Sequence, residues 1–340
     1  MKYVGIDLHK QSITVCVVDQ ARQILERHRL ICCDPGGIRG CFERLGPCRV
    51  VVEATASYEW LLRLIEPLVE QAVLAHPRKL RIIAESTRKS DKLDAQVLAE
   101  FLALDMIPRS YRPTPRQRDH RRLVRQRIAI QRRITSAKNR LRRLLSDYNA
   151  DIPGLFTERG RAHLATVPLS EADRFAADQI LAECRFHQQQ LAESDAALRR
   201  FAGSAPAAEA EARALLLSIP GVGRVTAEVV LSELADIRRF RSQKQVVAYA
   251  GFSPGQRESA GKSRELHIEK TGSKHLRWIL VEAAWQLVRR TARWKTIYEN
   301  LKRRLGSKKA IVAVARRLLG VMTAILQSGQ PYRHAHASAA

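Results

Sequence analysis

Acidic residues are scarce in this sequence relative to basic ones. It contains 34 Asp and Glu against 59 Lys and Arg, so the net charge is +25 and the isoelectric point is near 10.6. A chain this basic is expected to bind a polyanion. A membrane surface is the weaker expectation, because the basic stretches contain few of the aromatic residues that settle at a bilayer interface.

Long apolar runs and paired cysteines are also missing. No run of eighteen apolar residues occurs, which argues against a membrane span. The first residues, MKYVGIDLHK, lack the regions of a signal peptide, so a cytoplasmic protein is expected. The six cysteines form no CxxC pair, and five of them lie in the first fifty residues. Zinc binding is therefore a weaker interpretation than reduced, mostly buried thiols.

The basic charge is unevenly distributed along the 340 residues, a length that predicts two or three domains. Residues 1–105 hold 15 Lys and Arg against 14 Asp and Glu, whereas the following 235 residues hold 44 against 20. One nearly neutral domain is therefore joined to a strongly basic remainder.

Residues 1–108 are expected to form an α/β domain. Three short segments rich in Val, Ile and Leu predict an antiparallel meander of strands at 3–8, 12–19 and 23–31. The elements predicted after the meander are a turn at 34–37, a helix near 37–45, a strand at 49–53, a helix at about 57–70 and a strand at about 71–76. This order is that of an RNase H-like fold.

The rest of the chain is expected to be helical after a linker marked by Pro108, Pro113 and Pro115. Apolar residues at three- and four-residue steps predict a long helix at 116–148, and a second helix at about 171–201 is expected to pack back on it. The apolar residues of the first helix are Leu123, Ile130, Ile134, Ala137, Leu141, Leu144 and Tyr148. The predicted domains are a coiled-coil hairpin at 116–202 and a mainly α-helical domain at 211–328, with a linker at 203–210 and a disordered tail at 329–340.

The first long helix is rich in arginine. Residues 112–143 contain 13 Arg and Lys and one acidic residue. A solvated basic face is one interpretation, but with so few acidic partners such a face would repel itself, and binding to phosphate resolves this better. The candidate nucleic-acid-binding residues are Arg121, Arg122, Arg125, Arg132 and Arg133.

Four carboxylates in the first domain stand out. Asp7 and Glu53 each end an apolar strand segment, VGID and VVVE, while Asp91 and Asp94 lie at the start of a helix predicted to run to about 104. A spacing of three residues puts Asp91 and Asp94 on one helical face. Oxygen ligands of this kind suit Mg²⁺ or Mn²⁺, and two such ions can assist phosphodiester chemistry.

Each of these acids also has a structural interpretation. Asp91 could be a helix N-cap with Asp94 as its partner in a capping box, and Asp7 could be a turn residue. Glu53 is harder to explain this way, because an unpaired acid at the end of a Val-rich strand is costly.

The segment LSIPGVGRVTA resembles the hairpin of a helix-hairpin-helix motif. Gly221 and Gly223 would let backbone amides approach a phosphate, and the following helix would add its N-terminal dipole. A tight turn between two packed helices is the alternative, since Pro-Gly-x-Gly also makes one.

A serine-containing loop follows, in the segments YAGFSP and RESAGKS before a helix at about 273–291. A serine there could attack a phosphodiester while Arg257, Lys262 and Arg264 stabilise the developing charge. A flexible Ser/Gly loop is the alternative. Of the four nearby serines, Ser253 is expected in a turn and Ser273 as a helix cap, which leaves Ser259 and Ser263.

Several of these segments together resemble a known family. GID, VVEATASY, KSDKLDAQVLAEF, LLLSIPGVG, YAGFSP and RESAGKS occur here in the order found in the DEDD transposases of bacterial insertion sequences, family one-ten, which includes the Piv-type DNA invertases. The resemblance covers nearly the whole chain, and its motifs are specific in combination.

The resemblance implies a RuvC-like domain whose acidic tetrad falls on Asp7, Glu53, Asp91 and Asp94. It also implies a catalytic serine at Ser259, which follows an acid in the family pattern, and a covalent phosphoserine link to DNA. The tetrad, with Mg²⁺ or Mn²⁺, would complete a composite site. The implied partners are donor and target DNA, a structured guide RNA in some members, and further copies of the chain in a homodimer or homotetramer.

Two other functions remain as alternatives. One is a RuvC-like nuclease that hydrolyses branched DNA with water as nucleophile and does not need Ser259. The other is a non-catalytic nucleic-acid-binding scaffold with a degenerate nuclease domain, against which the complete set of four acids argues.

Overall fold

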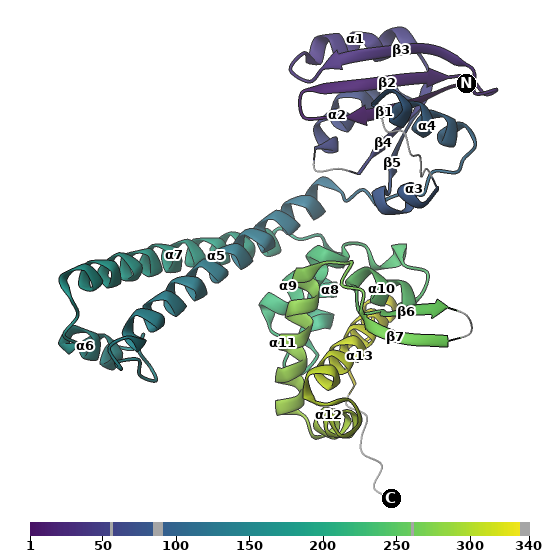
Figure 1. Ribbon diagram of the computed structural model, residues 1–340. Coiled ribbons are helices and arrows are strands. Elements are labelled where there is room, and N and C mark those ends of the chain that lie inside the picture. The colour runs from purple at the N-terminus through teal and green to yellow at the C-terminus, as the bar shows by residue number, and fades with distance from the viewer. Residues whose placement is uncertain (55–56, 84–90, 260–261, 334–340) are drawn as a thin grey trace, which may run out of the picture. The chain divides into compact units, whose positions relative to one another are not determined.

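A computed structural model describes residues 1–54, 57–83, 91–259 and 262–333 (Figure 1). The side chains at 81–83, 91–93, 254–259 and 262–267 are outside this description. The chain divides into two compact units, Met1–Arg112 and Pro113–Ala340, which we describe separately as unit 1 and unit 2.

Unit 1 contains a mixed five-stranded sheet. Its strands are β1 (Lys2–Leu8), β2 (Ser12–Val18), β3 (Ile24–Ile31), β4 (Cys48–Glu53) and β5 (Gln71–Ala75). The first three form an antiparallel meander, β4 runs parallel to β1, and β5 runs parallel to β4, giving the order β3-β2-β1-β4-β5. A mixed sheet of this kind, followed by a mostly helical remainder, is compatible with the predicted RNase H-like domain.

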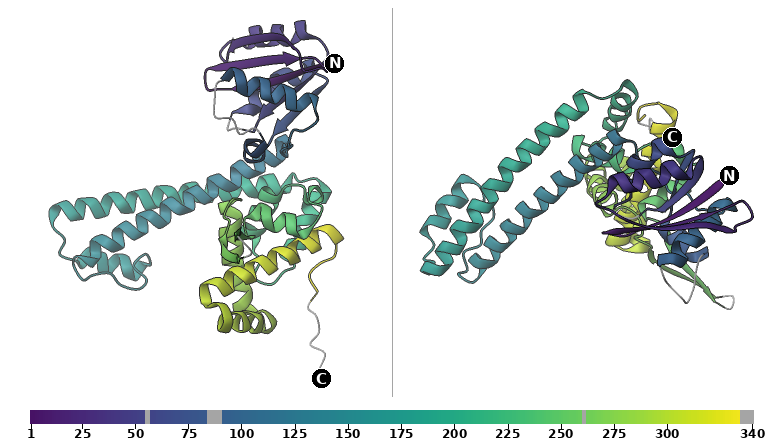
Figure 2. Two further views of the ribbon diagram at one scale, coloured as in Figure 1. Left: turned by 45° about the vertical axis from the view of Figure 1, so that its right-hand side comes forward. Right: turned by 90° about the horizontal axis from the view of Figure 1, so that it is seen from above.

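Helices cover both faces of this sheet, and the alternation of strand residues explains why (Figure 2). On one face, Val4 and Ile6 join a core with residues of α1 (Pro35–Leu45) and α2 (Tyr58–Ile65). A short 3-10 helix, Glu66–Leu68, follows α2. On the other face, residues such as Tyr3 and Val51 pack with α3 (Pro77–Ile83) and α4 (Asp91–Ala103). Because successive strand residues point to opposite faces, each strand contributes to both cores.

Helix α4 lies unusually close to β1 at one point. A Cβ atom added to Gly5 would lie 1.9 Å from the carbonyl oxygen of Ala95 and 2.5 Å from the amide nitrogen of Ala99. Both atoms belong to the helix backbone, so they cannot move aside as a flexible side chain would. Gly5 is therefore required by this close approach of helix and strand.

The six cysteines are all free thiols, and four of them, Cys16, Cys41, Cys48 and Cys184, are buried. Burial raises the pKa of the Cys48 thiol to about 11. A thiol with a raised pKa carries little thiolate at neutral pH and is correspondingly unreactive. These four cysteines therefore act as small apolar residues, as expected from their spacing.

Two long helices of unit 2, α5 (Pro115–Ser146) and α7 (Glu171–Gly203), pack along each other, with α6 (Glu158–Thr166) between them in the chain (Figure 1). A capping box at Thr114 and Gln117 starts α5, with Pro115 in its first turn. The expected apolar seam is partly correct. Ile130, Ile134, Ala137 and Leu141 are buried, Leu123, Leu144 and Tyr148 are partly buried, and Val124, Ile128 and Leu145 are buried in addition.

The C-terminal part of unit 2 is mainly helical. Its helices are α8 (Ala207–Leu217), α9 (Arg224–Leu234), α10 (Gln243–Ala250), α11 (Lys274–Arg290), α12 (Ala292–Leu305) and α13 (Ser307–Ser328), with a 3-10 turn at Ile237–Arg239. Val124 and Ile128 of α5 and Leu198 of α7 belong to the same core as these helices. The expected regions 116–202 and 211–328 therefore form one compact unit.

A two-stranded antiparallel hairpin interrupts the helices where a Ser/Gly loop was expected. Its strands are β6 (Pro254–Ser259) and β7 (Lys262–Ile268). The expectation of a region that stays helical to about 328 was wrong here. The polar sequence of β6 lacks the apolar alternation that marks a strand, so its periodicity does not indicate one, and β6 is defined by its pairing with β7.

The last helix, and Tyr332 after it, pack onto the C-terminal core. Helix α13 is long and apolar enough to cross a membrane by length and composition, and it is the one such helix among the described residues, but 56% of its most apolar window is buried. After α13, Tyr332 accepts a hydrogen bond from Trp294 Nε1 at 3.1 Å, and its own amide donates to Ser218 Oγ at 2.9 Å. The predicted disordered tail is therefore packed as far as Tyr332, and residues 334–340 lie outside the described residues.

We expect Gly5→Ala to destabilise unit 1 by roughly 2–3 kcal/mol, because the added methyl group overlaps the backbone of α4. Gly40→Ala is the matched control in the same unit, since its added Cβ would meet only the end of Arg44 at 3.6 Å. Gly40 lies inside α1, where alanine stabilises a helix by up to about 1 kcal/mol. Hydrogen exchange of the β1 and β2 amides in urea measures both effects, and equal protection in the two variants would contradict the close approach.

Candidate functional site

Asp7 and Glu53 lie at the same edge of the sheet of unit 1. Strands β1 and β4 run in parallel with Ile6 opposite Val52, so Asp7 and Glu53 are the next residues along each strand. Val52 and Ile6 belong to the core under α1 and α2, which places Asp7 and Glu53 on the opposite face, the one that α4 covers. Two acidic residues from distant sequence segments thus occupy neighbouring strand ends on one face of the sheet.

Asp7 has a histidine neighbour that sequence reasoning missed. Its Oδ2 atom lies 3.0 Å from Nε2 of His9, and the Asp7 side chain is 16% exposed. The signal in the sequence was the spacing of two residues, because His9 comes directly after the end of β1 at Leu8 and so remains close to Asp7.

Helix α4, which covers this face, begins with the other two candidate acids. It packs on β1, β2 and β4, with Ala95 and Ala99 against Gly5. Asp91, the first residue of α4, precedes Ala95 by four positions and therefore occupies the same helical face. Asp94 is described and exposed, whereas the side chain of Asp91 lies outside the described residues.

The described side chains do not form a complete metal site. Among them, no three His, Cys, Asp or Glu side chains lie close enough together to hold a metal ion. The side chain of Asp91 is outside the described residues. The donor chemistry of the candidate residues nevertheless fits a hard divalent cation, because all four candidates carry carboxylate oxygens.

Ser259 lies in the hairpin of unit 2, not in a loop. In β6 and β7, Ser259 pairs with Lys262 and Arg257 pairs with Arg264, whereas Glu258 pairs with Ser263. Directly paired positions share a face of an antiparallel ribbon, and so do positions two apart on one strand. Ser259 is therefore a position of the face that carries Arg257, Lys262 and Arg264, and Ser263 is a position of the face that carries Glu258. Ser273 is the N-cap of α11, as expected.

The two glycines of the PGVG turn between α8 and α9 differ in their surroundings. Gly221 has φ +80°, and an added Cβ would lie 3.0 Å from the amide nitrogen of Leu287 in α11. It therefore serves the close packing of the turn on α11. Gly223 is the N-cap residue of α9, and nothing lies within 4 Å of its added Cβ. Of the two, Gly223 is the one whose backbone is open to a ligand.

Many arginines of α5 have acidic or carbonyl partners from other helices. Arg125 forms an ion pair of 2.9 Å with the buried Glu233, and Arg121 donates to the carbonyl oxygen of Ser232 at 3.1 Å. Further ion pairs along the same helix join Arg116 to Glu209, Arg127 to Asp195, Arg140 to Glu183 and Arg142 to Asp151. The premise that this helix lacks acidic partners was wrong, because acids that are distant in sequence reach it in the fold.

The candidate arginines therefore fall into two groups. Arg121 and Arg125 bond to α9, although the side chain of Arg125 is still 48% exposed. Among the described residues, Arg122, Arg132 and Arg133 are exposed and make no ion pair or hydrogen bond to another helix. Arg122 has one weak contact, 3.7 Å to the exposed Asp119. The exposed three are the ones available to an external phosphate.

Comparison with known proteins identifies this combination of domains. Residues 4–150 match a DEDD domain model of IS110 elements described as "Transposase". Residues 213–299 match a model described as "Transposase IS116/IS110/IS902 family", and the two matches together cover more than half of the chain. The chain belongs to this transposase family.

Its relatives include whole-length transposases. The chain is 27% identical over 343 residues to a "Probable family 20 transposase" of Pseudomonas aeruginosa, covering 97% of this chain and 98% of the relative. It is 29% identical to the "Transposase for insertion sequence element IS1328" of Yersinia enterocolitica, over 83% of this chain and 82% of the relative. A "Pilin gene-inverting protein" of Moraxella bovis is 28% identical over 35% of this chain and 38% of its own length. The chain is thus an enzyme that acts on DNA, and its DEDD domain implies dependence on a divalent metal ion.

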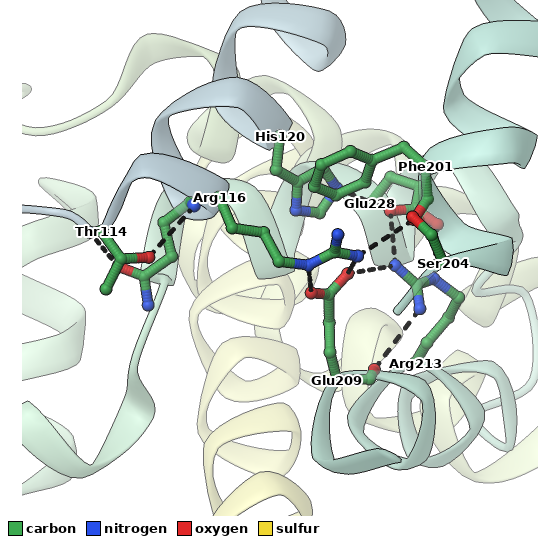
Figure 3. A network of polar contacts seen from close by, with 9 residues as sticks. Thr114, Arg116, His120, Phe201, Ser204, Glu209, Arg213 and Glu228 are labelled. Carbon is green, nitrogen blue, oxygen red and sulfur yellow. Dashed lines mark hydrogen bonds and ion pairs between the residues drawn. The ribbon is translucent and has the colours of Figure 1, made fainter. Parts of the chain in front are cut away.

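The transposase holds its basic helix in place through a buried polar network (Figure 3). Glu228 of α9 is 3% exposed and accepts hydrogen bonds from Arg213 Nε at 2.6 Å and Arg213 Nη2 at 3.2 Å, while its Oε2 atom lies 2.7 Å from His120 Nε2. Glu209 bridges Arg213 to Arg116 of α5, with ion-pair distances of 3.0 and 2.6 Å. The network therefore joins α5, α8 and α9 at one point.

Aromatic contacts extend this network to α7. The ring of Phe201 stacks on His120, with centroids 5.0 Å apart, and the guanidinium of Arg116 lies 4.0 Å from the centroid of the same ring. Phe201 also contributes its carbonyl oxygen as an acceptor for Arg116 Nη2 at 3.0 Å. A single aromatic residue thus fixes the end of α7 against the start of α5.

The charge partners keep the two buried carboxyls ionised. Burial alone would raise the pKa of Glu228, but hydrogen bonds from His120 and Arg213 outweigh it and hold this pKa below its usual value of 4.5. At Glu233, burial would also raise the pKa, but the hydrogen bond and the charge of Arg125 outweigh it and lower the pKa of this carboxyl. Both acids therefore stabilise the fold in their charged form.

We expect Glu228→Gln to lower the stability of unit 2 by about 3 kcal/mol at neutral pH, since it removes one partner of a buried ionic network. Because the pKa of Glu228 is depressed on folding, its contribution is complete above pH 4.5 and is lost as the pH falls through the lower folded value. The difference between the variant and the original protein should therefore shrink on acidification below pH 4.5.

Urea unfolding at several pH values measures this difference through tryptophan fluorescence, because Trp278, Trp285 and Trp294 all lie in unit 2. The matched control is Glu211→Gln on the exposed side of α8, which should change little. A Glu228→Gln penalty that is the same at pH 3 and pH 7 would show that the charged form is not what stabilises the network.

Proposed function

We propose that this transposase exchanges DNA strands with two sets of residues, an acidic tetrad and a serine nucleophile. The tetrad is Asp7, Glu53, Asp91 and Asp94, and the nucleophile is Ser259. The observation that carries the proposal is the convergence of Asp7 and Glu53 on the sheet face that α4 covers, since α4 begins with the other two acids. A capping box alone would not require Asp7 and Glu53 to lie there.

The four carboxylates would hold Mg²⁺, or Mn²⁺, through their oxygen atoms. A bound ion would stabilise the charge that develops on phosphate and leaving oxygens. The exposed position of Asp94 suits an acid that meets DNA, because it leaves a coordinating oxygen accessible to the solvent side of the helix.

The hairpin register supports Ser259 over Ser263 as the nucleophile. Ser259 shares its face with Arg257, Lys262 and Arg264, and cations on that face favour the approach of a phosphodiester. Ser263 is paired with Glu258, and a carboxylate there would repel the phosphate. The charge on the two faces of the hairpin thus favours Ser259, which the sequence alone favoured only through the family resemblance.

The chemical step transfers a phosphoryl group from DNA to the serine. The Ser259 oxygen forms a bond to phosphorus and gives its proton to a base, while the bond from phosphorus to one ribose oxygen breaks and that oxygen takes up a proton. The reverse step, with the ribose oxygen of another strand as nucleophile, releases the serine and joins the strands. No external energy source is needed, because one phosphodiester replaces another.

The proposed partners follow from this chemistry. The enzyme acts on donor and target duplexes, in the cytoplasm where the chromosome lies, and a structured guide RNA would direct it as in some members of the family. Two duplexes require at least two active sites, so a homodimer or homotetramer is proposed. Inversion of a DNA segment is a second candidate outcome, favoured by the similarity to the pilin gene-inverting protein.

The exposed arginines of α5 are the proposed phosphate contacts, with the open backbone of Gly223 as a further one. Arg122, Arg132 and Arg133 are exposed, whereas the guanidinium groups of Arg121 and Arg125 already bond to α9. Phosphate contacts of this kind dominate affinity and depend on salt.

Replacing Arg122, Arg132 and Arg133 together with Gln is expected to weaken nucleic-acid binding and flatten its salt dependence. The slope of log affinity against log salt should fall by up to about 0.9 for each lost duplex contact. Arg125→Gln is the control, because its partner is Glu233, and it should reduce stability while leaving the slope unchanged. Fluorescence anisotropy with labelled duplex at several salt concentrations gives the slopes. A larger change in slope for Arg125→Gln than for the triple variant would show that Arg125, and not the exposed three, contacts phosphate.

The decisive experiment for the proposed function is the search for a covalent protein–DNA adduct. With element-end DNA, guide RNA and Mg²⁺, the original protein should form an adduct that resists denaturing electrophoresis, and Ser259→Ala should abolish it while retaining nucleic-acid binding. Ser263→Ala is the matched control on the other face of the hairpin and should retain the adduct. Mass spectrometry of the digested adduct identifies the modified residue.

Two further variants test the tetrad. Asp7→Asn and Asp94→Asn should also abolish the adduct, as should removal of the metal ion with a chelator, because both acids would act through the bound cation. DNA cleavage without any adduct would support the hydrolytic nuclease instead. An adduct retained by Ser259→Ala but lost in Ser263→Ala would overturn the assignment of the nucleophile.

A further inference from the structure

The outer face of α7 carries a regular row of exposed residues. Its members follow one another at alternating steps of three and four, and we call them the outer seam: Ala172, Phe175, Gln179, Ala182, Phe186 and Gln189. Phe175 is 67% exposed and Phe186 is 58% exposed, which makes them the two most exposed large apolar side chains on this helix. A seven-residue repeat of this kind is the pattern by which one helix packs against another.

The outer seam is distinct from the contact that α7 makes within its own chain. The buried residues of α7 include Ala177, Cys184 and Leu198, and α5 is the helix with which α7 packs most extensively. None of the seam residues is buried. The face that carries Phe175 and Phe186 is therefore left over after the α5–α7 pair has formed.

The outer seam is self-complementary when two copies of α7 run antiparallel. Phe175 and Phe186 lie at equal distances from a point between Ile180 and Leu181. A two-fold axis through this point brings Phe175 of one copy onto Phe186 of the second copy, and Ala172 onto Gln189. Each phenylalanine then gains an aromatic partner, and each small residue faces a larger one.

Charges beside the seam select the antiparallel arrangement. Asp178 and Arg185 are exposed, each directly precedes a seam residue, and neither takes part in an ion pair within the described part of the chain. In an antiparallel pair, the residues that directly precede Gln179 and Phe186 lie on the same flank of the seam. Asp178 of one copy therefore lies within one helical turn of Arg185 of the other, and this pairing occurs twice. In a parallel arrangement, Asp178 would instead lie beside Glu183 of the second copy, and like charges repel.

The net charge of α7 also allows two such basic chains to approach here. The helix contains six acidic residues and four arginines, in a chain whose net charge is +25. Repulsion between two copies is therefore lower along α7 than along the arginine-rich α5.

We propose that two copies of the chain associate through antiparallel pairing of their α7 helices along the outer seam. Phe175 and Phe186 provide the apolar contacts, and the two Asp178–Arg185 pairs fix the register. The partner is a second copy of this chain, and the contact does not depend on the proposed chemistry at Ser259 or the tetrad.

A charge-exchange experiment tests the proposal on the full-length protein, freed of nucleic acid by nuclease and high salt. Sedimentation equilibrium at moderate salt should show a dimer for the original protein. Asp178→Arg and Arg185→Asp should each raise the dimer dissociation constant by about tenfold or more, because each creates two like-charge contacts. Combining the two changes restores opposite charges, so the double variant should return to within about threefold of the original value.

The apolar contacts and the direction of pairing need separate controls. Phe175→Gln with Phe186→Gln should abolish the dimer while leaving the helical circular dichroism unchanged, because both side chains are exposed. For direction, one copy carries Ala172→Cys and the other Gln189→Cys, each in a Cys33→Ser background, since Cys33 is an exposed cysteine. A short bismaleimide should join the mixed pair and not two copies of the Ala172→Cys chain, whose cysteines are about 25 Å apart along the helix axis.

A protein that is monomeric at all concentrations would overturn the proposal. So would a double charge variant as weak as the single variants, a dimer that survives loss of both phenylalanines, or cross-linking of Ala172→Cys to itself. Because the readouts are mass and cross-linking alone, failure of the recombination chemistry leaves them unaffected.

Discussion

Unit 2 depends on the ionic contacts of two carboxylates that are buried in α9. Glu228 and Glu233 are each almost fully enclosed, and each meets cations from α5 or α8. Removing such a charge from water is costly, and the cost is offset when several donors converge on it. The position of the arginine-rich helix is thereby tied to the C-terminal core, which is why regions that look like separate domains in the sequence behave as one unit.

The sheet of unit 1 and the ends of the long helices could be predicted from sequence because local patterns specify them. The strands up to residue 53 have a clear apolar character, and Thr114, Pro115 and Gln117 mark the start of α5 by their capping chemistry. The hairpin at Pro254–Ile268 could not be predicted, because its strands are polar and their pairing is a contact between segments rather than a property of either one. The same holds for the acidic partners of α5, since Glu228 is 108 residues from His120 and Glu233 is 108 residues from Arg125.

The candidate site likewise combines features that the sequence predicts with features that only the fold reveals. Asp7 and Glu53 are recognisable as acids that end apolar strands. The parallel register of β1 and β4 explains why both lie at the same edge of the sheet. Their common face follows from counting residues along β1 and β4, yet the need for Gly5 beneath α4 does not, because it depends on how closely the helix approaches. His9 was missed for a related reason, since its contact with Asp7 depends on the path of the chain just after β1 ends at Leu8.

The anchoring of Tyr332 has a practical consequence for anyone who labels this protein. Its contacts with Trp294 and Ser218 fasten the chain end beside the last turn of α8, close to where the PGVG segment begins. A fluorescent protein or affinity tag fused after the C-terminus would therefore be tethered to a fixed point at Tyr332, beside Ser218. A spacer of flexible residues longer than the natural segment after Tyr332 would keep such cargo away from that turn.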